Sequence, residues 1–199
     1  MKNNLSDWGL SKYLSCILCL LAFSQDVYGK IDSELQNRLV QMAKQSLEIT
    51  QQNHSDNNEV LQQLQTDLLN LHSETLQAIV SLHGWPSESL VGTQGVTAAF
   101  IIVQHSQDLL FQQNMLPLII QSYLNGQGIT GQSVAIITDL VAIKQDKPQI
   151  FGTQYDVING KVIFKPIANI STIDSLRAEL SLVPFAEFKQ QLESKYKDN

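Results

Sequence analysis

The most apolar stretch of the chain, residues 93–106, reads TQGVTAAFIIVQHS. Its apolar run is long enough for a buried helix, and a buried strand is the competing interpretation. Small residues at 97–99 would let such a helix lie close to its neighbours. We therefore expect this segment to form the central helix of the fold.

On the N-terminal side of this segment, residues 31–53 and 59–82 are polar and helical in composition. Apolar residues recur in both at helical spacing, and these are Leu35, Leu39, Met42, Ala43, Leu47, Leu61, Leu64, Leu68, Leu71, Thr75, Ile79 and Leu82. A polar turn cluster at 53–58 separates the two segments, so we expect an antiparallel helical hairpin.

The outer faces of this hairpin are rich in glutamine, of which the chain has 23. No heptad pattern with charged flanking positions is sustained, which favours a solvated surface over a partner-binding coiled coil. His54 and His72 fall on solvated positions of the hairpin and are set aside as candidates.

Turn signals and a change in hydrophobic periodicity divide the rest of the chain into further elements. Pro86 follows Gly84 and Trp85 and ends the helical pattern. Beyond it, helices are expected at 108–124, with Pro117 inside, from Ser171 or Thr172 to Leu180, and from Pro184 to about Lys195. Residues 130–143 are a short apolar run. Alternating residues at 149–158 and 161–167 flank Asn159-Gly160, which predicts a β-hairpin.

The resulting fold class is mainly α with one β-hairpin (α+β). Residues 1–29 are expected to be a signal peptide and 30–82 the helical hairpin. Residues 83–199 are expected to form an α+β domain that makes a single globular unit with the hairpin.

The N-terminal residues resemble a secretory signal. An apolar run at 13–23 follows Lys2 and Lys12 and is too short to span a bilayer. Cleavage is expected after Gly29, with Ala22 a poorer site, so the protein would be exported to the periplasm or the medium. The alternatives are lipid attachment at Cys16 or Cys19, an uncleaved anchor, which would be the chain's only membrane contact, and a buried first helix.

Composition excludes several classes of protein. The 199 residues carry a net charge of −6, and both cysteines lie in the segment that export would remove. An acidic chain does not suit phosphate neutralisation, so no nucleic-acid partner is expected. Cleavage of the signal would remove both cysteines and with them any thiolate ligand or nucleophile. No phosphate loop or zinc motif is present, so no cofactor is expected.

Polar residues beside apolar segments are the candidate site. His105 ends the most apolar segment and would be partly buried, and Asp139 lies within the run at 130–143. The further candidates are His83, Gln104, Gln112, Gln149, Thr153 and Gln154. Each also has a structural interpretation: a satisfied core histidine, a helix cap or a strand bulge. His83, His105 and Asp139 could together form a metal site, but their spacing is not diagnostic of one.

The same residues resemble an uncharacterised bacterial family known only as a domain of unknown function. The shared motifs cover roughly residues 75–190, and they are His-Gly-Trp-Pro at 83–86, Val-Gly at 91–92, Gln-His at 104–105, Phe-Gln at 111–112, Asp139, Pro-Gln at 148–149 with Gly-Thr-Gln at 152–154, and Arg177. The resemblance implies that His83, Gln104, His105, Asp139, Gln149 and Gln154 converge, and it adds Trp85 and Arg177 as candidate ligand-binding residues. It brings no activity with it.

Besides Phe151, which stands where the family has a tyrosine, two positions depart from the family pattern. Leu140 replaces an arginine after the aspartate, and Ser181 replaces a late glycine. The missing arginine removes a cation that could pair with Asp139 or hold an anionic ligand. If the family is enzymatic, this copy would therefore be altered or inactive.

Two hypotheses follow. In the first, an exported protein binds or hydrolyses a small polar, peptide or glycan ligand. His105 is then the general acid or base, oriented by Asp139, and Gln104 and Gln154 stabilise an oxyanion. In the second, the polar cluster is structural, and the glutamine-rich hairpin binds a protein partner without catalysis.

Overall fold

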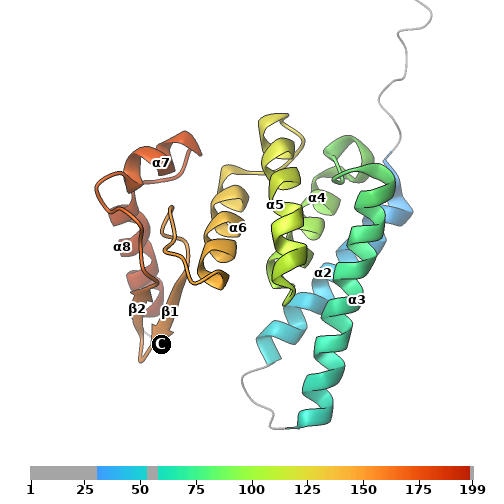
Figure 1. Ribbon diagram of the computed structural model, residues 1–199, viewed down its shortest axis with the longest axis horizontal. Helices are drawn as coiled ribbons and strands as arrows, with labels where there is room; N and C mark the ends of the chain where they lie inside the picture. The colour runs from blue at the N-terminus through green and yellow to red at the C-terminus, as the bar shows by residue number, and fades with distance from the viewer. Residues whose placement is uncertain (1–30, 53–57, 198–199) are drawn as a thin grey trace, which may run out of the picture. The chain divides into compact units, whose positions relative to one another are not determined.

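A computed structural model describes residues 31–52 and 58–197 and shows a mainly helical fold with one β-hairpin, as the sequence predicts. The elements in this described part are α2 (Ser33–Gln52), α3 (Glu59–His83), α4 (Glu88–His105), α5 (Leu109–Leu124), α6 (Gly131–Lys144), β1 (Tyr155–Ile158), β2 (Lys161–Phe164), α7 (Ile173–Glu179) and α8 (Phe185–Tyr196) (Figure 1). The expected signal peptide lies outside the described residues.

Helix α4 is the central helix and contacts α2, α3, α5 and α6. It begins at Glu88, five residues before the predicted segment, because a first helical turn precedes a kink at Gly92, where φ is 64°. The Gln36 side chain of α2 donates a hydrogen bond to the Val91 carbonyl at this kink, over 2.8 Å. The glycine therefore gives α2 access to the backbone of α4.

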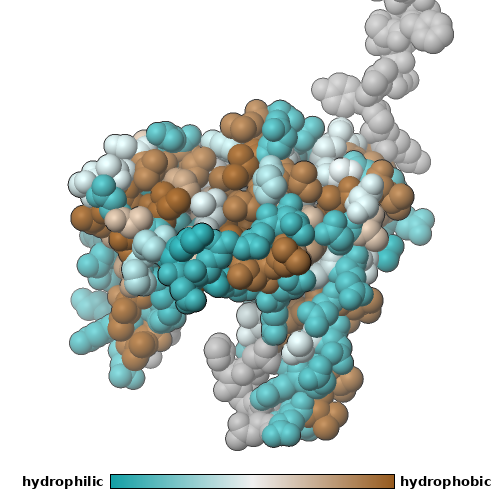
Figure 2. All heavy atoms as spheres, in the orientation of Figure 1, coloured by the Kyte–Doolittle hydropathy of each residue, from teal (hydrophilic) through white to brown (hydrophobic). Residues whose placement is uncertain are grey.

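The buried face of α3 differs from the leucine repeat seen in the sequence. Its buried residues are Leu69, His72, Ser73, Leu76, Ile79 and Val80. Leu64, Leu71 and Leu82 are instead 60%, 54% and 80% exposed, and Figure 2 shows hydrophobic atoms along the outer edge of this helix. Apolar residues occupy two neighbouring faces of α3, so periodicity alone could not identify the buried one.

Helices α2 and α3 run in opposite directions, but α2 packs chiefly against α4 (Figure 1). His72 is only 4% exposed, so the expectation that it is solvated is wrong. Its Nδ1 lies 3.0 Å from Ser46 Oγ, and its Nε2 lies 3.1 Å from Gln45 Oε1, both on α2. Burial lowers the pKa of His72, which keeps the ring neutral at pH 7. His54 lies outside the described residues.

Side-chain caps begin the next two helices. Asp108 accepts a hydrogen bond from the Phe111 amide of α5, and Thr130 accepts one from the Ser133 amide of α6. Pro117 lies inside α5, as expected. Buried side chains of α5 and α6, among them Met115, Ile119 and Ile137, complete the core around α4.

The β-hairpin turns at Asn159-Gly160, where both residues have positive φ, as the sequence predicts. Its strands pair antiparallel with Tyr155 opposite Phe164, and they are shorter than the alternating segments. Gly152, with φ of 73°, turns the backbone away before β1, and Gln149 forms only an isolated bridge to Ile167.

Helix α8 packs against this hairpin, and α7 contacts α8. Phe185 of α8 meets Phe164 of β2 edge to face, with ring centroids 4.8 Å apart. Among the described residues, no helix has the length and apolar character needed to cross a membrane.

Candidate functional site

Asp139 of α6 is fully buried and holds the loop at 149–154. Its Oδ1 accepts hydrogen bonds from the amides of Ile150 and Phe151, over 2.7 and 3.0 Å. Its Oδ2 accepts from the Thr153 amide and hydroxyl, both over 2.9 Å. Four donors therefore occupy the carboxylate, and each of them comes from the loop.

Gln149 is also fully buried and closes the same loop. Its Nε2 donates to the carbonyls of Gln154 and Lys165, each over 2.9 Å, and its Oε1 accepts from the Gln154 amide over 2.8 Å. This side chain replaces backbone pairing where Gly152 interrupts the strand. Its position is structural, since its amide nitrogen and oxygen both bond to the main chain.

Arg177 and Gln112 likewise bind main-chain carbonyls. Arg177, 2% exposed, donates to the Val183 and Phe151 carbonyls, both over 2.7 Å. Gln112 donates to the Val103 and Ser106 carbonyls at the end of α4, over 2.9 and 3.0 Å. Burial lowers the pKa of Arg177, while Asp174 and Asp139 raise it.

His105 is half-buried and is bonded to α2 rather than to Asp139. Its Nδ1 lies 3.0 Å from the Thr50 hydroxyl, which itself donates to the Ser46 carbonyl over 2.9 Å. This chain of bonds places the ring proton on Nδ1. Burial lowers the pKa of His105. The expected orientation of His105 by Asp139 is not found, because both groups are bonded elsewhere.

His83 and Trp85 lie at the other end of α4 from His105. His83 is exposed and lines a small cavity of about 190 Å³ with the start of α2, and Trp85 is buried in the core at 8% exposure. Helix α4 has 18 residues and is about 27 Å long, so His83 and His105 cannot share one metal ion. No group of three potential metal ligands occurs within residues 31–52 and 58–197.

Three of the predicted residues do meet in one cavity, which we call the amide pocket. Its volume is about 390 Å³, and its lining residues are Gln104, Gln132, Ile136, Thr153, Gln154, Tyr155, Phe188 and Leu192. They come from α4, α6, the 149–154 loop, β1 and α8. The loop that Asp139 and Gln149 hold in place thus forms one wall of the pocket.

The amide pocket is electrically neutral, although the chain as a whole carries a charge of −6. Gln154 Nε2 donates within the wall, to the Thr153 hydroxyl over 3.0 Å and to the Ile136 carbonyl over 3.3 Å. Burial and a hydrogen bond with Tyr196 raise the pKa of Tyr155 to about 12, so its phenol stays protonated. The pocket therefore offers amide and hydroxyl groups beside apolar surfaces.

Five lining residues were not singled out from the sequence: Gln132, Ile136, Tyr155, Phe188 and Leu192. Gln132 and Ile136 lie one helical turn apart, and Ile136 comes three residues before Asp139, so a shared face of α6 could have indicated them. Phe188 and Leu192 have the same spacing on α8. Nothing in the sequence shows that α8 lies opposite α6.

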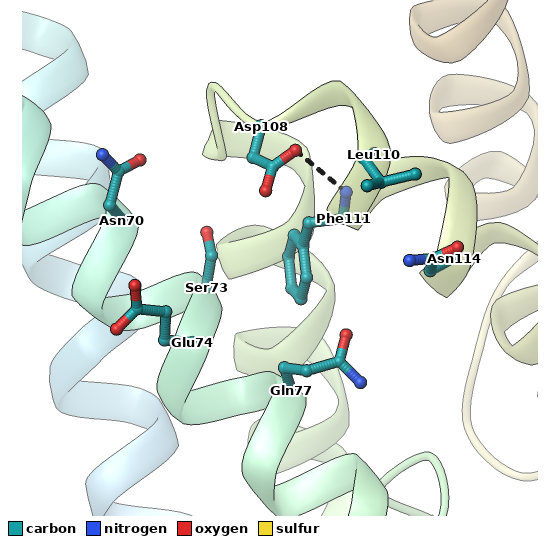
Figure 3. A pocket seen from close by; sticks show the side chains of 8 residues that line it. All are labelled: Asn70, Ser73, Glu74, Gln77, Asp108, Leu110, Phe111 and Asn114. Atoms are coloured by element: carbon teal, nitrogen blue, oxygen red, sulfur yellow. Dashed lines mark hydrogen bonds between the residues drawn. The ribbon is translucent and has the colours of Figure 1, made fainter.

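A second pocket, of about 480 Å³, lies between α3 and the start of α5 (Figure 3). Its lining residues, none of them a predicted candidate, are Asn70, Ser73, Glu74, Gln77, Asp108, Leu110, Phe111 and Asn114. Asp108 is bonded to the Phe111 amide, and Ser73 donates to Ser106 Oγ over 2.8 Å. The amide pocket is the stronger candidate site, because three of the predicted residues line it and none of them lines this second pocket.

Comparison with known proteins gives a family but no activity. No curated protein and no solved structure matches the chain. Residues 33–198, which include every described helix and both strands, match the Family of unknown function (DUF6624). The family match thus covers the amide pocket and the loop that forms its wall, and the chain belongs to this family of unknown function.

Proposed function

We propose that the chain binds a small uncharged ligand that carries hydroxyl and amide groups, for example an N-acetylated sugar. The observation that carries the proposal is the neutral lining of the amide pocket in an acidic protein. Gln104, Gln132 and the side-chain oxygen of Gln154 would form hydrogen bonds with the ligand, while Ile136, Phe188 and Leu192 supply apolar surface. A charged ligand would find no counter-charge among these side chains.

Binding without catalysis fits the lining better than hydrolysis does. None of the eight side chains of the pocket exchanges a proton near neutral pH. Asp139 is fully buried, and its carboxylate accepts a hydrogen bond from the Thr153 hydroxyl. Gln104 and Gln154 then recognise a ligand, and no oxyanion is involved. The proposal includes export after cleavage near Gly29, which the N-terminal residues predict.

Titration calorimetry of the full chain with N-acetylglucosamine tests the proposal. We expect binding that Gln104→Ala weakens about tenfold, because one direct hydrogen bond in a desolvated pocket is lost. Gln107→Ala is the matched control, since Gln107 is exposed, lies three residues further on and does not line the pocket. Tighter binding of glucose 6-phosphate than of the neutral sugar would contradict a neutral-ligand site.

A further inference from the structure

Helix α3 carries an apolar stripe that the remaining described residues leave accessible. Its members alternate at spacings of three and four, the a and d positions of a heptad, and they are Leu61, Leu64, Leu68, Leu71, Thr75, Ala78 and Leu82. We call them the α3 seam. Charged residues flank this stripe on one side only, so the sequence pattern alone did not indicate a coiled coil. Leu64 and Leu71 at its middle are 60% and 54% exposed, and Leu82 at its end is 80% exposed.

The shape of the α3 seam suits a helix. It extends for about 32 Å along one helix and is only two positions wide, which is the contact that one partner helix makes by knobs-into-holes packing. Four leucines of the seam are exposed, and half-buried Leu68 and Thr75 lie between them. Exposed leucines that are grouped along one helix face mark interaction surfaces, whereas scattered single ones do not.

The charges along the seam identify the chemistry of its partner. Asp67 and Glu74 occupy the flanking g positions, and Glu59 lies in the first turn. The 25 residues of α3 contain no lysine or arginine. A partner helix with basic residues beside its apolar stripe would therefore complement this edge.

A second copy of the same helix fits less well. In an antiparallel pair, g positions lie near each other, which would bring Asp67 and Glu74 against their own equivalents. A parallel pair instead needs the e positions, which are Gln65, His72 and Ile79. His72 and Ile79 are buried within the chain at 4% and 6% exposure and cannot serve.

We propose that the α3 seam binds an amphipathic helix of another protein, one with apolar residues at a and d and with lysine or arginine facing Asp67 and Glu74. This proposal is independent of the amide pocket, to which α3 contributes no residue.

The probe is a synthetic three-heptad peptide with leucine at a and d and lysine at e and g, and binding to the full chain is measured by fluorescence anisotropy. We expect the double variant Leu64→Gln, Leu71→Gln to bind it at least about tenfold more weakly. The control, Leu110→Gln with Leu124→Gln, replaces leucines that are 65% and 69% exposed on α5 and keeps wild-type affinity. All four positions are exposed, and circular dichroism confirms folding.

Charge is tested with Asp67→Asn combined with Glu74→Gln, which should weaken binding and reduce its salt dependence. Equal affinity for a peptide with glutamate at e and g, or equal losses in the control variant, would overturn the proposal. So would a dimer in sedimentation that the seam variant dissociates, because a second copy would then be the occupant. Flotation of the chain with lipid vesicles, abolished by the seam variant, would also overturn it, because the seam would then bind a membrane surface.

Discussion

At the scale of single residues, buried polar side chains shape the amide pocket without lining it. Asp139, Gln149 and Arg177 each bond to main-chain groups of the loop or its surroundings. A turn at Gly152 leaves amides and carbonyls that no strand pairs, and burial makes unpaired groups costly. These three side chains satisfy them, so they shape the amide pocket through the position of Thr153 and Gln154.

Asp139→Asn should lower the free energy of unfolding by about 2 kcal/mol, because a neutral amide replaces a carboxylate that accepts from four donors. Urea unfolding followed by fluorescence measures the loss. Asp146→Asn is the control, since Asp146 is exposed and its positive φ suits asparagine, and it should change stability by less than about 0.5 kcal/mol. Similar losses in the two variants would show that the carboxylate does not hold the loop.

His72 makes stability depend on pH. Burial lowers its pKa in the folded chain, so the unfolded chain binds more protons as the pH falls below the ordinary value of about 6.5. Its contribution is fully present above that pH and is lost as pH falls through the folded pKa. The slope for one such group can reach about 1.4 kcal/mol per pH unit.

Unfolding free energies measured in urea between pH 7 and pH 5 should therefore fall, and fall less steeply for His72→Gln. The residual slope in that variant includes His105, whose pKa burial also lowers. His83→Gln is the control, because that residue is exposed. Parallel pH profiles for wild type and His72→Gln would contradict a buried neutral ring.

At the scale of elements, α6 begins against the end of α7. A Cβ on Gly131 would overlap the Leu180 carbonyl oxygen and lie 2.9 Å from its carbon. Both atoms belong to the backbone, so no side-chain rotation relieves the overlap. The close approach fixes the N-terminal end of α6, from which Gln132 faces the amide pocket.

Gly131→Ala should therefore destabilise the chain more than Gly126→Ala does, although only Gly126 has a positive φ. The second substitution meets open space and costs about 1 kcal/mol of left-handed strain. Thermal unfolding of both variants provides the comparison. A larger loss for Gly126→Ala would show that the α6–α7 contact adapts.

Local signals predicted these elements well where they were strong. The β-hairpin at Asn159-Gly160 and the buried helix ending at His105 follow from backbone conformation and from an apolar run that must leave water. The buried face of α3 could not be predicted, because its two apolar faces differ only in which one α2 and α4 cover. His72 was misjudged for the same reason.

At the scale of the whole molecule, the amide pocket gathers residues from distant parts of the sequence, from Gln104 to Leu192. Gln104, Thr153 and Gln154 could be selected as polar residues beside apolar or glycine-containing segments. Their neighbours on α8 could not, because helix–helix packing depends on tertiary contacts that leave no local pattern. Polarity identified candidates, but only packing separates Asp139, which supports a wall, from Gln104, which faces the cavity.

Because α8 contributes to the amide pocket, the pocket can close only after α8 has been synthesised. Phe188 and Leu192 lie on α8, so a chain emerging from the ribosome lacks this wall until α8 has been released. Premature termination upstream of α8 would leave the central helices with their core residues but without the closed pocket. A closed amide pocket would thus distinguish molecules that contain α8 from molecules that lack it.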